Sequence, residues 1–218
     1  MNPENNALSR TYFIAGPMRV GKTTLAYRLA EKIGGHVVST DAIRNAAKKV
    51  CENKTGPLFR INTYNDLSEE EWLDRHFNHP EAVVQDLIGE SEAIWRSVVS
   101  FCNVFCEDNA RHIVEGIALL PHLVAGMDHR PEHIVYVGNT SSTHVDTMLD
   151  YGIENPEQCW MRAIGYSEER IRGMANLVFH LSLHLKAEAE KYGFRYIEIS
   201  DEKFDQSVDQ VISELTRV

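Results

Sequence analysis

A candidate phosphate-binding loop lies near the start of the chain. Residues 16–23 read G-P-M-R-V-G-K-T, which fits the Walker A pattern G-x-x-x-x-G-K-[ST]. Glycines at the first and sixth positions let the backbone turn tightly and come close to a phosphate, and inward-pointing N–H groups form an anion site. Lys22 supplies a charge for the β- and γ-phosphates, and Thr23 supplies a hydroxyl for Mg²⁺. The pattern predicts a nucleotide site made by Gly16, Pro17, Met18, Arg19, Val20, Gly21, Lys22, Thr23 and Thr24.

Two carboxylates stand at the ends of predicted strands. Asp41 directly follows strand 36–40, and Glu115 lies near the end of strand 112–116. Ligands of parallel sheets bind at the carboxyl edge, so both groups should lie close to the loop. Asp41 can accept the proton of a substrate hydroxyl, with a helix cap as its alternative role. Glu115 can hold Mg²⁺ through water or bind substrate hydroxyls, with a buried structural acid as the alternative.

The elements that must position these groups alternate between strand and helix. We expect strands at 12–15, 36–40, 112–116, 133–138 and 194–200. We expect helices at 22–33, at 42–50, from Pro80 to about residue 108, from Ser167 to Gly193 and at 204–215, with a short helix that starts at 155–156 and ends near Gly165. Residues 51–80 show weak periodicity and form a predicted irregular, partly helical insertion, whose acidic run at 66–74 is a solvated helix face. Such alternation predicts one α/β domain over residues 1–218, with five parallel strands covered on both faces.

Two further segments match known enzymes. Residues 39–44 read S-T-D-A-I-R and resemble the S-T-D-x-I-R of 2-phosphoglycerate kinase. Residues 113–121 read I-V-E-G-I-A-L-L-P and resemble that family's I-x-E-G-x-H-L-x-P, with Ala118 in place of His. With the loop at 16–23, the chain resembles the P-loop small-molecule kinases, which include the zeta-toxin and chloramphenicol phosphotransferase groups. This resemblance implies a strand order of 2-3-1-4-5, ATP and Mg²⁺ as cofactors, and Asp41 as the catalytic base.

The resemblance also assigns roles to arginines. Small kinases place a mobile lid at the position of residues 155–175, so Arg162 first and Arg170 second are the expected catalytic arginines, with Arg172 a third candidate. Their partners should arrive only with the phosphates. The acceptor site falls at Arg44 and the insertion, where Arg44 and Arg60 suit an anionic group of the substrate. The alternatives are a surface role for Arg44 and a pairing of Arg60 with the acids at 66–74.

These observations favour an ATP-dependent kinase of a small, anionic, hydroxylated metabolite. A nucleotide-binding regulator is one rival, but it needs no hydroxyl base. A nucleoside or oligonucleotide kinase is another, and the formal net charge of −10 disfavours nucleic acid as a partner. The chain also lacks the N-K-x-D sequence that GTPases use for guanine.

Cysteine and histidine usage predicts no further metal site. Cys51, Cys102, Cys106 and Cys159 contain no C-x-x-C pair and are expected to be free thiols in a reducing cytoplasm. Cys102 and Cys106 share a predicted helix face and could form half a site, and His180 and His184 are one turn apart without a third ligand. The polar first ten residues contain no signal peptide, and no apolar run reaches membrane-spanning length, so we expect a cytoplasmic protein that does not contact membranes.

Overall fold

The computed structural model describes residues 10–104 and 110–217. Within them, five strands form one all-parallel sheet in the order β2-β3-β1-β4-β5, which confirms the predicted fold class and strand order. The strands are β1 (Thr11–Ala15), β2 (Gly35–Ser39), β3 (Arg111–Gly116), β4 (His133–Gly138) and β5 (Arg195–Glu198). Because β1 lies between β3 and β4, the loop that follows it opens at the middle of the carboxyl edge.

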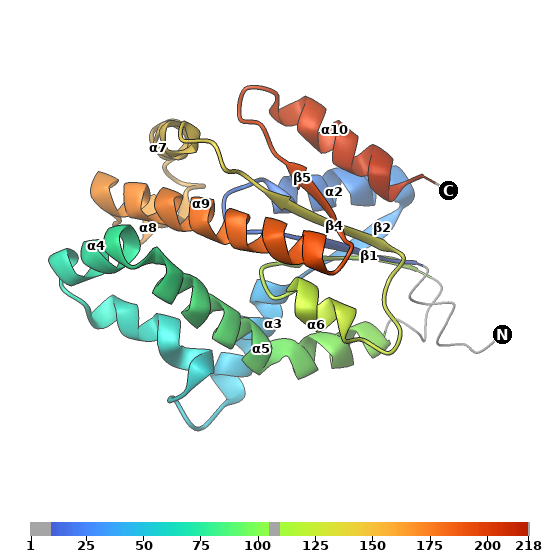
Figure 1. The fold of residues 1–218 in the computed structure, drawn as a ribbon, viewed down its shortest axis with the longest axis horizontal. Helices are drawn as coiled ribbons and strands as arrows, with labels where there is room; N and C mark the ends of the chain where they lie inside the picture. The colour runs from blue at the N-terminus through green and yellow to red at the C-terminus, as the bar shows by residue number, and fades with distance from the viewer. Residues whose placement is uncertain (1–9, 105–109, 218) are drawn as a thin grey trace.

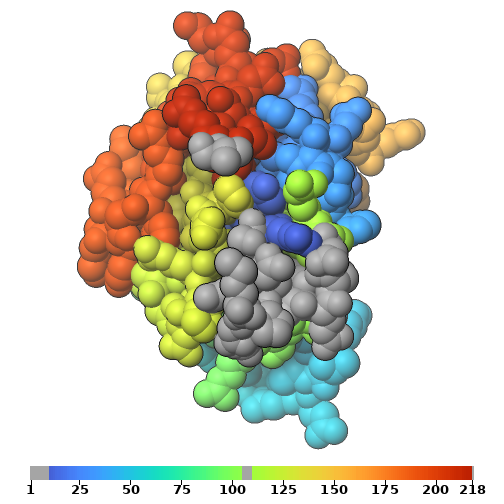
Figure 2. Space-filling view, turned by 90° about the vertical axis from the view of Figure 1, so that its right-hand side faces the viewer, coloured from blue at the N-terminus to red at the C-terminus, as the bar shows by residue number. Residues whose placement is uncertain are grey.

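Helices connect every pair of consecutive strands, as parallel pairing requires. Figure 1 shows α2 and α10 on one side of the sheet and α5, α6 and α9 on the other. The helices are α2 (Lys22–Ile33), α3 (Thr40–Val50), the 3-10 helix η1 (Pro57–Asp66), α4 (Glu69–Asn78), α5 (Pro80–Val104), α6 (Pro121–Ala125), α7 (His144–Glu154), α8 (Trp160–Ala163), α9 (Glu168–Lys191) and α10 (Phe204–Leu215). In both Figure 1 and the space-filling view of Figure 2, the C-terminal segment that contains α10 lies beside the blue segment that contains α2.

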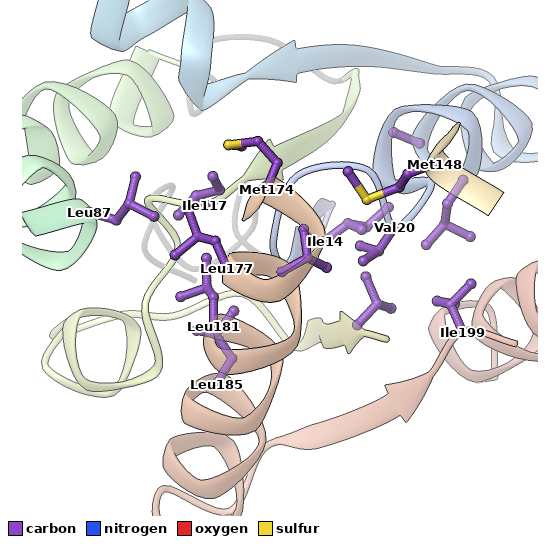
Figure 3. Close-up of a cluster of buried hydrophobic side chains, with 14 of the residues drawn as sticks. Ile14, Val20, Leu87, Ile117, Met148, Met174, Leu177, Leu181, Leu185 and Ile199 are labelled. Carbon is purple, nitrogen blue, oxygen red and sulfur yellow. The ribbon is translucent and has the colours of Figure 1, made fainter. Parts of the chain in front are cut away.

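Alternate residues of the central strands enter two apolar layers, which is the pattern of a sheet buried on both faces. Phe13, Val114 and Tyr136 cluster with side chains of α5 and α6, whereas Ile14 and Val135 cluster with those of α2 and α10. The second cluster continues around the carboxyl edge, where Figure 3 shows the α9 side chains Leu177 and Leu181 near Ile14. The central strands that lead to the carboxyl edge are therefore packed against apolar side chains on both faces of the sheet.

Three local features differ from the sequence predictions. Helix α3 is capped by Ser39, whose side chain accepts from the Asp41 amide at 3.2 Å, so the alternative that Asp41 is the cap is wrong. Helices α6 and α7 were not predicted. Asn155 ends α7 and does not start the short helix, which is α8 and follows Cys159. The predicted end of the long helix near residue 108 and the thiol Cys106 lie outside the described residues, and Cys51 and Cys159 are free thiols.

The insertion is more ordered than its weak periodicity predicts. Helix α4 starts with a capping box in which the Ser68 hydroxyl and the Glu71 carboxylate each accept from the other residue's amide. Helix α4 lies against α9, where a Cβ added to Gly173 would come within 2.7 Å of the Trp72 ring. Asn176 donates to the His76 carbonyl at 2.7 Å across the same contact. Across the described residues, the helices are either too short or too polar to span a bilayer.

Candidate active site at the carboxyl edge

The loop between β1 and α2 is shaped by close contacts with its neighbours. A Cβ on Gly16 would lie 2.3 Å from the Val137 carbonyl oxygen, so only glycine lets β4 come this close to the loop. Gly21 has a φ of 83° and caps α2, and its missing side chain leaves room for the Phe204 ring, 2.4 Å from an ideal Cβ. Arg19 has a φ of 65°, which is uncommon for a residue with a side chain. The expected tight turn is present, and the backbone supports it from two sides.

Lys22 is buried at the start of α2, and its ammonium turns back over the loop. Its Nζ donates to the Pro17 carbonyl oxygen at 2.6 Å. Burial lowers the pKa of Lys22, while the negative charges of Glu115 and Asp41 raise it in part. The ammonium is thus held inside the loop close to two carboxylates, and a phosphate that enters the loop would meet a desolvated positive charge.

Glu115 lies near the carboxyl end of β3, between the ends of β1 and β2. It lies opposite Ser39 in the register of β3 and β2, and it is 5% exposed. Burial raises the pKa of Glu115, and the charge of Lys22 together with hydrogen bonds from Ser39 and Thr23 lowers it in part. The predicted residues Lys22, Thr23 and Glu115 therefore form one polar group at the carboxyl edge.

The oxygen donors of this group fit a hydrated Mg²⁺. Thr23 is exposed at the loop, and its hydroxyl and the Glu115 carboxylate are hard oxygen ligands of the kind Mg²⁺ takes along with water and phosphate oxygens. No group of three histidines, cysteines and acids that could hold a metal occurs in the described parts of the chain. A metal at this edge would therefore depend on water and on phosphate for most of its ligands.

Asp41 lies at the start of α3 in a network of alternating charges. Its side chain is 52% exposed, and its Oδ1 lies 3.3 Å from the Arg44 guanidinium. Arg44 also contacts the Glu90 carboxylate at 3.2 Å, and Lys48 donates to the other oxygen of Glu90. Glu90 comes from α5 and is 2% exposed. A buried carboxylate between two cations therefore fixes Arg44 beside Asp41.

Arg44 and Arg60, which were predicted to bind an anionic group of the acceptor, both form ion pairs with acids of α5. Arg60 contacts Asp86 of α5 at 3.7 Å and has a side chain that is 58% exposed. Its acidic partner is thus outside the run at 66–74, so the alternative that Arg60 pairs with that run is wrong. Between Asp41, Arg44 and Glu90 on one side and Ile117 and Ala118 on the other, a cavity of about 10 Å³ remains. That is about the space of one water molecule, so a larger ligand would fit between these residues only if α3 and α5 separated.

The lid arginines already have carboxylate partners, contrary to expectation. Arg170 donates to Glu69 at 2.5 Å, and its guanidinium also lies over the Trp72 and Tyr166 rings. Arg162 lies 3.9 Å from Glu168, and Arg172 lies 3.7 Å from Glu169. The first contact joins the lid segment, residues 155–175, to α4 of the insertion. Of the two predicted catalytic arginines, Arg162 has the longer ion pair and is the easier to release.

Two sets of contacts at the carboxyl edge were not predicted from the sequence. The Arg19 guanidinium lies 4.2 Å from the centroid of the Tyr151 ring of α7. Beyond β4, Asn139 and Asp201 surround His144, with His144 Nδ1 2.9 Å from Asp201 Oδ1. Arg19 belongs to the Walker A pattern, but Tyr151 lies far from it in the sequence. Asp201 is likewise 57 positions from His144, so spacing gave no signal for either contact.

Comparison with known proteins gives little further information. No protein-family model matches the chain, and no curated protein sequence matches it. Among solved structures, a dephospho-CoA kinase from Campylobacter jejuni matches with 17% sequence identity over 95% of this chain and 98% of that chain. Its TM-score is 0.42. A likeness at that level carries no argument about the activity of this chain.

Proposed function

We propose that this chain is an ATP- and Mg²⁺-dependent phosphotransferase that acts on a hydroxyl of a small, anionic metabolite. The observation that carries the proposal is the meeting of Lys22, Thr23, Glu115 and Asp41 at one edge of the sheet. A cation on a phosphate-type loop beside a half-exposed carboxylate is what phosphoryl transfer to a hydroxyl requires. The same proposal treats the chain as one cytoplasmic domain, with the insertion and the lid segment as parts of it.

The loop and its surroundings would bind the nucleotide. When bound, ATP with Mg²⁺ supplies the transferable phosphoryl group. The N–H groups of residues 16 and 18–24 would bind phosphate oxygens, Lys22 would turn from the Pro17 carbonyl to the β- and γ-phosphates, and the Thr23 hydroxyl would be a ligand of the metal. Glu115 would hold the metal through water.

Asp41 would act on the acceptor. Its exposed carboxylate accepts the proton of the attacking hydroxyl, and Arg44, 3.3 Å away, keeps the carboxylate oriented. The ion pair with Glu90 fixes the position of the Arg44 guanidinium, so its positive charge stays beside Asp41. Arg60 has the weaker ion pair and turns from Asp86 to the anionic group of the acceptor. Arg162 and then Arg170 neutralise phosphoryl charge when the lid segment closes.

A phosphate-transfer assay against an acceptor panel tests the proposal. The panel contains hydroxy acids, sugar phosphates and uncharged polyols, and ³¹P NMR detects a new phosphoester. We expect ATP consumption to rise strongly with at least one anionic member and to be lost in Lys22→Ala. Slow ATP hydrolysis that no acceptor stimulates would favour the nucleotide-binding regulator. Transfer to a nucleoside or to an oligonucleotide end alone would favour the second rival.

A further inference from the structure

A second cavity is lined by residues other than those of the loop site. It is open to solvent on one side and has a volume of about 400 Å³ between the end of α4, the loop after β4, the start of α7 and the first half of α9. That volume falls within the range of small-molecule sites. Within the described chain, its walls include no residue of the P-loop and neither Asp41 nor Glu115. A ligand bound here would not need to compete with a nucleotide for its contacts.

One wall of the cavity is apolar and partly aromatic. Phe77 of α4, Phe179 of α9 and Val145 of α7 line it. Phe77 is 43% exposed although it stands on a helix that packs against α9. A cluster of exposed apolar side chains often indicates a ligand-binding groove or an interaction site. A ring or a branched hydrocarbon body would cover this wall.

A weakly engaged cation lies at one end of the same cavity. Arg172 lines it, and its side chain is 42% exposed. In the described residues its one ion pair is with Glu169 on the same helix, at 3.7 Å. An exposed pair of that length contributes little to stability. The guanidinium is therefore available to a carboxylate or phosphate, which it can bind through two parallel hydrogen bonds.

A polar atom without a partner is found in another lining residue, His144. This side chain is 4% exposed, and its Nδ1 lies 2.9 Å and 3.1 Å from the two oxygens of Asp201. Burial raises the pKa of Asp201, but the hydrogen bond and charge of His144, with a hydrogen bond from Asn139, give a net lowering. An ionised carboxylate only accepts, so Nδ1 of His144 carries a proton. Nε2 is buried and has no partner in the described residues, a state that costs stability.

We propose that the cavity binds a small amphipathic acid that carries an aromatic or branched body and a hydroxyl. The body lies against Phe77 and Phe179, the acid group meets Arg172, and the hydroxyl forms a hydrogen bond with Nε2 of His144. Because the walls come from α4 of the insertion, from the start of α7 and from α9, which begins inside the lid segment, the ligand also stabilises the contact between α4 and α9.

Titration with 4-hydroxyphenylacetate tests the site, because this probe carries all three groups. Binding is measured on the full chain by ¹H–¹⁵N NMR, and we expect saturable shifts at α4, α7 and α9. Arg172→Gln should raise the dissociation constant about tenfold, the worth of one charge-assisted contact. Arg195→Gln is the matched control, since its guanidinium is 60% exposed and lies 3.8 Å from Glu214, away from the cavity.

Changes in the probe test the other contacts without disturbing the buried histidine. The methyl ester should bind wild type and Arg172→Gln equally, and phenylacetate, which lacks the hydroxyl, should bind more weakly than the probe. No saturable binding, or binding that Arg172→Gln leaves unchanged, overturns the proposal. Displacement of the probe by an ATP analogue, or its loss in Lys22→Ala, would also overturn it, because the probe would then occupy the loop.

Discussion

Arg19 of the P-loop stacks on Tyr151 of α7, with the guanidinium carbon 4.2 Å from the ring centroid. The contact holds a residue whose φ of 65° is unfavourable for a side chain, and its Nε is buried without a partner in the described chain. The ring therefore stabilises the shape of the loop before any nucleotide arrives. A cation–π contact of this kind contributes about 0.5–2 kcal/mol.

Replacing Tyr151 should loosen the loop. Tyr151→Leu removes the ring, and we expect the dissociation constant for an ATP analogue to rise about three- to tenfold. Tyr151→Phe keeps an aromatic face and serves as the control. Calorimetric titration of both variants measures the effect. Equal affinities in the two variants would show that the stack does not shape the binding site.

Glu90 should be more important for stability than other acids of α5. Glu90→Gln leaves Arg44 and Lys48 without their shared buried counter-charge, at an expected cost of about 2–4 kcal/mol in the free energy of unfolding. Glu81→Gln, on the same helix but with a side chain that is 76% exposed, should change it by less than about 0.5 kcal/mol. Urea denaturation compares the two. A loss of similar size in both variants would contradict the anchoring role.

Two glycines in long helices should respond to alanine with opposite signs. At Gly173 the new methyl would lie 2.7 Å from the Trp72 ring and force α4 away from α9, which should cost about 1–3 kcal/mol. At Gly89 the nearest atom is Pro57 Cβ at 3.6 Å, an ordinary contact, so the gain in helix propensity should stabilise by up to about 1 kcal/mol. Thermal unfolding checks both signs. A stabilised Gly173→Ala protein would mean that α4 does not pack on α9 as described.

Acid should destabilise the contact between the insertion and α9 through His76. Burial, together with the charges of Arg170 and Arg75, lowers the pKa of His76 to about 4, although a hydrogen bond to the Trp72 carbonyl opposes the shift. The folded state thus stays neutral while the unfolded state takes up a proton near its pKa of 6.5. The contribution of neutral His76 to the free energy of unfolding is fully present above pH 6.5. It is lost between pH 6.5 and 4, by about 2–3 kcal/mol.

A paired substitution isolates this proton. His76→Asn keeps a donor for the Trp72 carbonyl and cannot titrate, so its stability should fall less than that of wild type over the same pH range. His79→Asn is the control, because His79 has a side chain that is 65% exposed. Parallel pH profiles for wild type and His76→Asn would contradict a neutral, buried His76.

Local patterns predicted most of the fold, and long-range contacts account for what they missed. Helices 22–33 and 204–215 have the predicted bounds because their apolar spacing and end signals agree. Helix α7 was missed because it buries few residues, among them Met148 and Leu149, in a polar stretch. The cap of α3 is Ser39 and not Asp41. Serine and aspartate both favour the N-cap position, so the sequence alone does not show which of the two neighbouring residues takes it.

The candidate site divides in the same way. The loop, Asp41 and Glu115 could be placed because they follow strands of a parallel sheet. Glu90 could not, because a glutamate on a long helix is usually solvated and its partners are 42 and 46 residues away. The partners of Arg60 and Arg170 were equally hidden, since they depend on how α5 and α4 pack.

The most direct test of the proposed mechanism compares phosphoryl transfer with nucleotide affinity in Asp41→Asn. If Asp41 accepts the hydroxyl proton, the maximal rate with the best acceptor should fall by about 10²–10⁴ while the dissociation constant for the ATP analogue stays the same. The fold should persist, because Ser39 caps α3. A wild-type maximal rate in Asp41→Asn would contradict the account.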